Sequence, residues 1–137
     1  MINIRRAAPS DEKNVTELLE GLLLSHPLLK LENFFVADKN GEVIGVAHFE
    51  DCGENGYLSA VGVREEMRRK GVARALVSAV LGFTKKDVYV YTLESEVFSA
   101  LGFIVDCPPG DIPSREIYDC REDCDPDECS CMVIRRQ

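Results

Sequence analysis

The chain has 137 residues, a length that suits one domain with one hydrophobic core. Hydrophobic residues make up 45% of it, and no apolar run approaches the roughly 20 residues that span a bilayer. The net charge of −8 argues against a nucleic-acid partner, which usually requires a basic face. Residues 1–6 lack the long apolar segment of a signal peptide, so we expect a cytoplasmic protein with no membrane partner.

The first half of the chain predicts a strand, a helix and three antiparallel strands. Residues 2–7 alternate apolar and polar, which is typical of a short strand, and a helical spacing of leucines follows Asp11. Asn40-Gly41 is a strong signal for a tight hairpin turn. The three strands of this predicted meander span residues 33–38, 42–50 and 57–63.

The second half predicts a crossover unit and two final strands. A helix over 71–83 separates the strand ending at Val63 from a strand over 88–92, so these two strands should be parallel. A short helix over 94–101 and strands at 103–107 and 132–135, antiparallel to each other, complete the order. We therefore expect an α/β fold with a mixed sheet of about six or seven strands flanked by helices.

A basic turn connects the parallel strand to its helix. Arg68, Arg69 and Lys70 precede Gly71, which opens the helix. The first amides of a helix lack internal partners and carry partial positive charge, so this turn is suited to bind a diphosphate. A glycine there keeps a Cβ from holding the backbone away from the phosphates. The alternative is a solvated turn balanced by Glu65 and Glu66.

This turn resembles a known signature. Arg68-x-x-Gly71-x-Ala73 is similar to the acetyl-CoA motif of the GNAT acetyltransferases, in which Arg or Gln is followed by Gly and then Gly or Ala. The order of the predicted elements and Leu101-Gly102-Phe103 also resemble that family, over nearly the whole chain. The resemblance implies a GNAT fold in which two parallel strands splay apart and admit acetyl-CoA.

The resemblance also implies which residues bind the cofactor. The backbone of the parallel strand would bind the acetyl and pantetheine groups, and the Val61 amide would polarise the thioester carbonyl. The basic turn and the start of the helix would hold the diphosphate. The expected cofactor-binding residues are Val61, Gly62, Val63, Arg68, Arg69, Lys70, Gly71, Val72, Ala73 and Arg74.

The implied activity is acetyl-CoA-dependent N-acetyl transfer to a small amine or amino acid, by direct attack within a ternary complex. Phe98 stands where many members of the family have a tyrosine that acts as general acid, and it has no proton to give. Phe98 therefore supports a first alternative, an acetyl-CoA-binding module without turnover. A second alternative is a metal- or thiol-sensing protein that uses the cysteine-rich tail of the chain. The sequence does not distinguish a monomer from a homodimer.

The candidate catalytic residues lie on the predicted meander. His48 and Glu50 share one strand face, and Tyr57 begins the next strand. Each has a structural alternative: a hydrogen-bonded histidine on the sheet, a solvated carboxylate, or a core tyrosine. We expect the acceptor near the first helix, the 51–56 turn and the 108–130 loop.

A cysteine-rich, acidic insertion over 108–131 precedes the last strand of the predicted single domain, 1–137. Four thiolates can hold zinc, and disulfides and free thiols are the alternatives. These thiols belong to Cys120, Cys124, Cys129 and Cys131. With Ile112-Pro113, this tail resembles short amino-acid N-acetyltransferases of the N-acetylglutamate synthase type. Their cofactor strand usually begins Glu-Leu-Arg-Ser, whereas this chain has Tyr57-Leu-Ser-Ala60, so the acceptor stays open.

Overall fold

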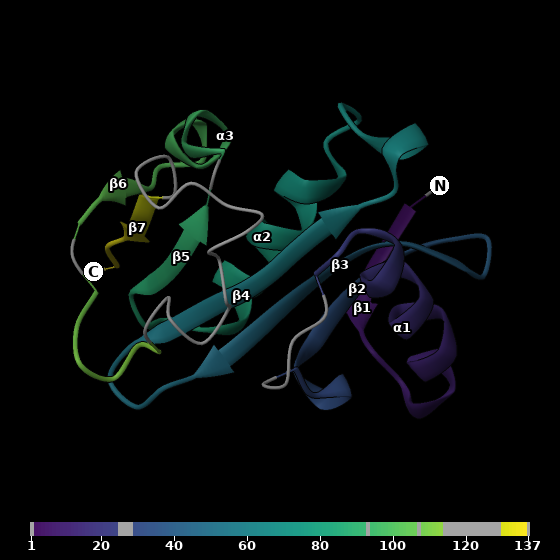
Figure 1. Ribbon diagram of the computed structural model, residues 1–137, viewed down its shortest axis with the longest axis horizontal. Helices are drawn as coiled ribbons and strands as arrows, with labels where there is room; N and C mark the ends of the chain where they lie inside the picture. The colour runs from purple at the N-terminus through teal and green to yellow at the C-terminus, as the bar shows by residue number, and fades with distance from the viewer. Residues whose placement is uncertain (1, 25–28, 93, 107, 114–129, 137) are drawn as a thin grey trace. The chain divides into compact units, whose positions relative to one another are not determined.

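The computed structural model describes residues 2–24, 29–92, 94–106, 108–113 and 130–136 (Figure 1). In this part of the chain seven strands form one mixed sheet in the order β1-β2-β3-β4-β5-β7-β6. The pairing of β4 with β5 is parallel, as predicted from the crossover. The strands are β1 Ile2–Arg6, β2 Phe34–Lys39, β3 Glu42–Asp51, β4 Gly56–Val63, β5 Val88–Thr92, β6 Ile104–Val105 and β7 Ser130–Ile134.

The predicted helices are confirmed with shifted ends, and short 3-10 turns flank them. None of the helices in the described ranges is long and apolar enough to span a bilayer. The helices are α1 Glu12–Gly21, α2 Val72–Phe83 and α3 Ser95–Ala100, and the 3-10 turns are η1 Pro9–Asp11, η2 Leu31–Asn33 and η3 Glu65–Met67.

Residue contacts divide the chain into two compact units. The first unit comprises Met1–Phe49 and Ser59–Thr84, and the second comprises Glu50–Leu58 and Lys85–Gln137. Strands β3 and β4 therefore contribute residues to both units. The single-domain organisation expected for residues 1–137 stays a prediction.

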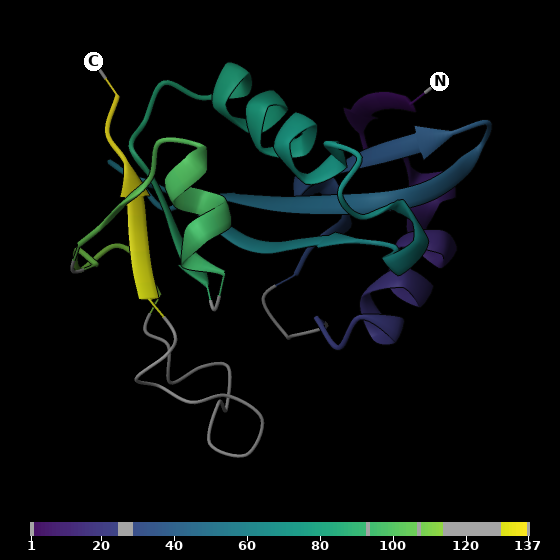
Figure 2. The ribbon, with the colours of Figure 1, turned by 90° about the horizontal axis from the view of Figure 1, so that it is seen from above.

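In the first unit, α1 and α2 cover opposite faces of the strands β1 to β3 (Figure 2). The α1 face is a buried cluster of Val15, Leu18, Leu19, Phe34, Val36, Val43 and Val46. On the other face Gly45 makes room for α2, because a Cβ there would lie 3.1 Å from side-chain atoms of Leu76 and Val72. The leucine and valine spacing that predicted each helix is the spacing that buries it.

In the second unit, β7 lies between β5 and β6. Tyr89 of β5 pairs with Val133 of β7, and Ile104 of β6 pairs with that same residue. The antiparallel pairing expected between the last two strands is thus confirmed, although β6 is much shorter than the predicted 103–107. A buried cluster of Tyr57, Tyr89, Ile112 and Val133 holds this unit together.

Candidate functional site

The basic turn that follows β4 contains two left-handed residues. Arg69 has φ 64° and Gly71 has φ 79°. The left-handed conformation costs a residue with a Cβ roughly 1–2 kcal/mol, so Arg69 is held there against its own preference. Gly71 is the N-cap of α2 and has no such cost. This backbone reverses the chain and starts the helix.

The start of α2 presents backbone amides. Its first helical hydrogen bond runs from the Ala75 N–H to the Gly71 carbonyl, at 3.0 Å. The N–H groups of Val72, Ala73 and Arg74 precede that bond and carry the positive end of the helix dipole. The space next to Gly71 is open, since no described atom outside its neighbours lies within 4 Å of an ideal Cβ.

The cations of the turn are not neutralised by the acidic residues beside them. Arg64 pairs with Glu42 and, at 3.9 Å, with Glu66. Arg68 donates from Nε to the Val63 carbonyl at 3.2 Å, which ties the turn to the end of β4. Within the described ranges, residues 68–70 are exposed and form no ion pair with residues 65 and 66. Three exposed cations therefore precede the first amides of α2.

The face of β4 changes between Ser59 and Gly62. Ser59 bonds to His48 on the α1 face of the sheet. A Cβ on Gly62 would meet Leu24 Cδ1 at 2.5 Å and Leu22 Cδ1 at 2.7 Å, and both leucines pack against the α1 cluster. Positions 59 and 62 thus face the same side of the sheet. Strict alternation would put them on opposite sides, so the alternation of β4 shifts by one residue between them, as in a β-bulge.

His48 is completely buried on β3, and both ring nitrogens have partners. Nε2 accepts a hydrogen bond from the Lys30 N–H at 3.1 Å. Nδ1 therefore carries the proton of the neutral ring and donates to Ser59 Oγ at 2.6 Å. The ring also meets Phe34 edge-on, with centroids 4.8 Å apart. This environment matches the structural alternative for His48.

Glu50 and Tyr57, the other two candidates, differ in their surroundings. The Glu50 Oε2 atom is buried and has no hydrogen-bond partner among the described residues. The Tyr57 side chain is 1% exposed, and its ring meets Tyr91 edge-on at 5.7 Å. A buried carboxylate oxygen without a donor is costly, so Glu50 is the group of these two whose environment calls for a further partner.

Comparison with known proteins decides the family. Residues 3–104 match the family model described as Acetyltransferase (GNAT) family. The chain belongs to this family. Acetyl-CoA-dependent acetyl transfer, which the sequence predicts, is thereby confirmed as the activity of this GNAT acetyltransferase. An uncharacterized N-acetyltransferase of Chlorobaculum tepidum is 29% identical over 119 residues, a match that covers 73% of this chain and 74% of the relative.

Solved structures share the GNAT fold at low identity. Rv2747 from Mycobacterium tuberculosis, in complex with CoA and NLQ, has a TM-score of 0.76 and 22% identity, covering 98% of this chain and 99% of its own. N-acetylglutamate synthase from Neisseria gonorrhoeae, complexed with coenzyme A and N-acetyl-glutamate, has a TM-score of 0.76 and 16% identity. It matches 100% of this chain, which spans 35% of the synthase.

Phe98 of this GNAT acetyltransferase is a core residue of α3. Its side chain is 6% exposed and meets Phe103 edge-on, with centroids 5.2 Å apart. The position of the usual tyrosine is therefore filled by a packed, apolar ring. A general acid for the leaving thiolate would have to come from another residue or from solvent.

The predicted metal ligands lie mostly outside the described residues. Of the four, the structure describes Cys131, which lies on β7 opposite Tyr91. The described ranges contain no group of three or more His, Cys, Asp or Glu that could hold a metal ion. A site formed by Cys120, Cys124, Cys129 and Cys131 stays a prediction.

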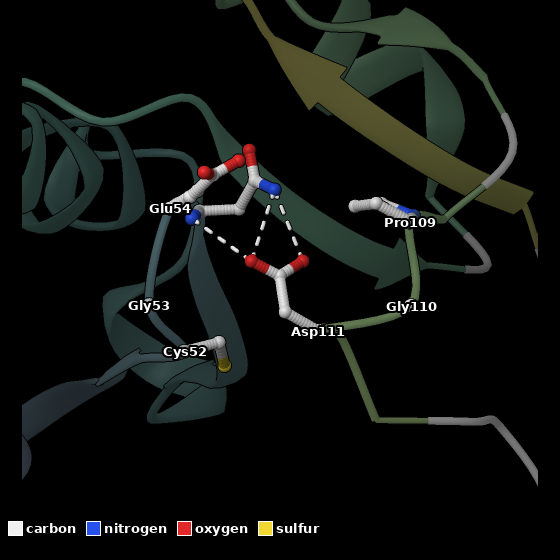
Figure 3. Close-up of a pocket in the computed structure, with 7 residues that line it drawn as sticks. Cys52, Gly53, Glu54, Pro109, Gly110 and Asp111 are labelled. Atoms are coloured by element: carbon white, nitrogen blue, oxygen red, sulfur yellow. Dashed lines mark hydrogen bonds between the residues drawn. The ribbon is translucent and has the colours of Figure 1, made fainter.

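An open, acidic cavity lies in the second unit, between the turn that joins β3 to β4 and the first residues of the 108–131 insertion (Figure 3). Asn55 connects the two sides by hydrogen bonds, because its backbone N–H and its Nδ2 donate to the Asp111 carboxylate at 3.0–3.2 Å. No sequence pattern predicts this contact. The acidic cavity measures about 450 Å³ and is lined by Cys52, Gly53, Glu54, Asn55, Pro109, Gly110 and Asp111.

The Cys52 thiol in the acidic cavity is a poor nucleophile. Burial, followed by the nearby charges of Glu50, Asp111 and Asp51, raises its pKa to about 11. Thiols react as thiolates, so covalent transfer of acetyl through Cys52 is disfavoured at neutral pH.

This pKa predicts slow alkylation of Cys52. With a pKa of about 11, on the order of one thiol in a thousand is ionised at pH 8, and the rate should rise about tenfold per pH unit up to that value. Residue-resolved mass spectrometry of iodoacetamide labelling measures this rate. Removing a nearby charge with Glu50→Gln should speed labelling, whereas an unchanged rate would show that burial alone sets the pKa.

Proposed function

We propose that this GNAT acetyltransferase moves the acetyl group of acetyl-CoA to the amine of a small molecule, by direct attack within a ternary complex. The observation that carries the proposal is the start of α2. Amides without helical partners, exposed cations and an open glycine coincide there. These are the features that bind a diphosphate. Fold neighbours solved with CoA support the same donor.

On the donor side, we assign the diphosphate to residues 68–74 and the pantetheine and acetyl groups to the backbone of residues 61–63. The hydrogen-bonded ladder of β4 with β5 includes Gly56–Leu58, and β4 continues to Val63. Backbone groups beyond the ladder suit the amides of pantetheine. The Val61 N–H would stabilise the oxyanion that forms as the amine attacks.

Substituting Gly71→Glu should reduce acetyl-CoA affinity about 100-fold or more, because a carboxylate would then oppose the diphosphate. Calorimetric titration with acetyl-CoA measures the change. Gly41→Glu is a matched control: Gly41 also has positive φ, 86°, and open space next to it, but it lies in the β2–β3 turn. If Gly71→Glu binds acetyl-CoA as tightly as Gly41→Glu does, the assignment of the diphosphate to residues 68–74 is refuted.

On the acceptor side, we propose that the acidic cavity attracts the amine and steers it toward the thioester, which we assign to the other end of β4. Glu54 and Asp111 bring carboxylates to the lining of the cavity, while Asp51 beside it is paired with Lys86. An ammonium group is attracted to such a cavity, whereas the side-chain carboxylate of glutamate is repelled. We therefore propose a cationic amine as acceptor rather than an acidic amino acid.

The test is release of CoA thiol from acetyl-CoA against a panel of amines. Aliphatic diamines and lysine should support turnover at lower concentrations than glutamate or glutamine. A panel in which glutamate is the best acceptor would overturn the charge argument and leave the donor site intact. Binding of acetyl-CoA without turnover on any amine would favour the alternative, a binding module.

For the proton transfer we propose Glu50 as general base. A base needs an available lone pair, and the ring nitrogens of His48 already bond to Lys30 and Ser59. Glu50 Oε2 lacks a described partner, and the Glu50 charge acts on Cys52 in the lining of the acidic cavity. The carboxylate would take the proton of the ammonium, directly or through water, and the neutral amine would attack the thioester. Because Phe98 gives no proton, CoA would leave as its thiolate when the C–S bond breaks, and the second proton of the attacking nitrogen would pass to that thiolate or to solvent.

Glu50→Gln should lower kcat/KM for the amine by about 10²–10⁴-fold, since an amide cannot take the proton, with little change in acetyl-CoA affinity. Steady-state kinetics and calorimetry separate these effects. Asp51→Asn is the control: this neighbouring, exposed carboxylate pairs with Lys86 at 2.5 Å, and its loss should leave kcat nearly unchanged. Retained activity in Glu50→Gln, together with loss in His48→Gln, would transfer the role to His48.

A further inference from the structure

We propose that Leu22 and Leu24 limit the size of the acyl group that this enzyme transfers. The inference rests on the proposed function, because it takes the backbone around Gly62 as the place of the thioester. It adds two residues outside the acetyl-CoA motif as determinants of donor specificity.

The contact that carries this inference is the position of the leucine methyls over β4. Leu24 Cδ1 lies 2.5 Å and Leu22 Cδ1 lies 2.7 Å from the place of a Cβ on Gly62. The two methyl groups thus occupy the volume that a side chain of residue 62 would take. They form an apolar wall directly against the backbone to which we assign the acetyl end of the donor.

The turn that ends α1 holds the two leucines in place. The Leu24 N–H bonds to the Leu19 carbonyl at 2.9 Å, and the Leu23 N–H bonds to the Glu20 carbonyl at 3.2 Å. This is the Schellman pattern, in which the residue after the C-cap is left-handed and usually glycine. Here that residue is Leu23, with φ 57°.

The Leu23 side chain points in the opposite direction from those of its two neighbours. Its side chain is 90% exposed, while Leu22 and Leu24 on either side pack against the α1 cluster. The left-handed residue therefore turns its neighbours inward and its own side chain outward. Two hydrogen bonds and the packing of Leu22 and Leu24 together hold this turn.

A wall of this kind discriminates by length. The methyl of an acetyl group would fit beside the leucines, and the additional methylene of a propionyl group would meet them. One methylene more or less in a packed apolar pocket changes kcat/KM by about 10–200-fold. The leucines would thus favour acetyl-CoA over longer thioesters.

The experiment compares acetyl-, propionyl- and butyryl-CoA in the wild type, Leu22→Ala, Leu24→Ala and Leu23→Ala. The ratio of kcat/KM for propionyl-CoA to that for acetyl-CoA should rise about tenfold or more in Leu22→Ala or Leu24→Ala. Leu23→Ala is the matched control, with the same truncation one residue away, and should keep the wild-type ratio. An unchanged ratio in both inward variants would overturn the proposal.

A second pair of variants tests the same contact if truncation alone impairs folding. Gly62→Ala should push the leucine methyls and lower acetyl-CoA turnover, and combining it with Leu24→Ala should restore part of the loss. No restoration would contradict the contact. If the wild type releases no CoA with any amine, the proposed function fails, and the ratio of calorimetric affinities for the two thioesters still tests the leucines.

Discussion

Backbone pairing between β3 and β4 is the constraint on which the rest of the structure depends. The two strands are neighbours in the sheet, and each contributes residues to both compact units. Every candidate for proton transfer lies on them: His48 and Glu50 on β3, and Tyr57 on β4. Because strand alternation fixes which side chains share a face, the register of this pair decides which candidates can act together.

Two polar residues of β3 differ in how their polar atoms are bonded. His48 is enclosed by an amide, a hydroxyl and an aromatic ring, so its polar atoms are satisfied within the first unit. Glu50, two residues further on the same face, has a buried oxygen without a described partner. A fully bonded group stabilises a fold, whereas a buried group without a partner calls for an explanation such as strain, a catalytic role or a bound water. This contrast, rather than residue type, is why we propose Glu50 and not His48 as the general base.

Much of the fold is predictable from the sequence, because local patterns and global structure agree. Alternation and helical spacing predict the strands and helices, and the length of the 64–87 connection predicts the parallel pair. The motif at Arg68, Gly71 and Ala73 predicts the family, which the match over residues 3–104 confirms. What the sequence does not predict comes from contacts between distant residues. No local sequence pattern predicts the hydrogen bonds of His48 to Lys30 and Ser59. The same is true of the hydrogen bonds from Asn55 to Asp111 and of the position of the leucines over Gly62.

The left-handed backbone has a consequence for how this protein tolerates heat. Among the described residues, Leu23, Asn40 and Arg69 have positive φ without being glycine. Asparagine adopts this conformation at little cost. Leucine and arginine each lose roughly 1–2 kcal/mol, out of a free energy of unfolding that is small in most proteins. Glycine at 23 and 69 would remove that strain. Glycine also gives the unfolded chain more freedom, which offsets part of that gain, so the strain relieved at these two positions, which flank the proposed path of the donor, exceeds the net stabilisation.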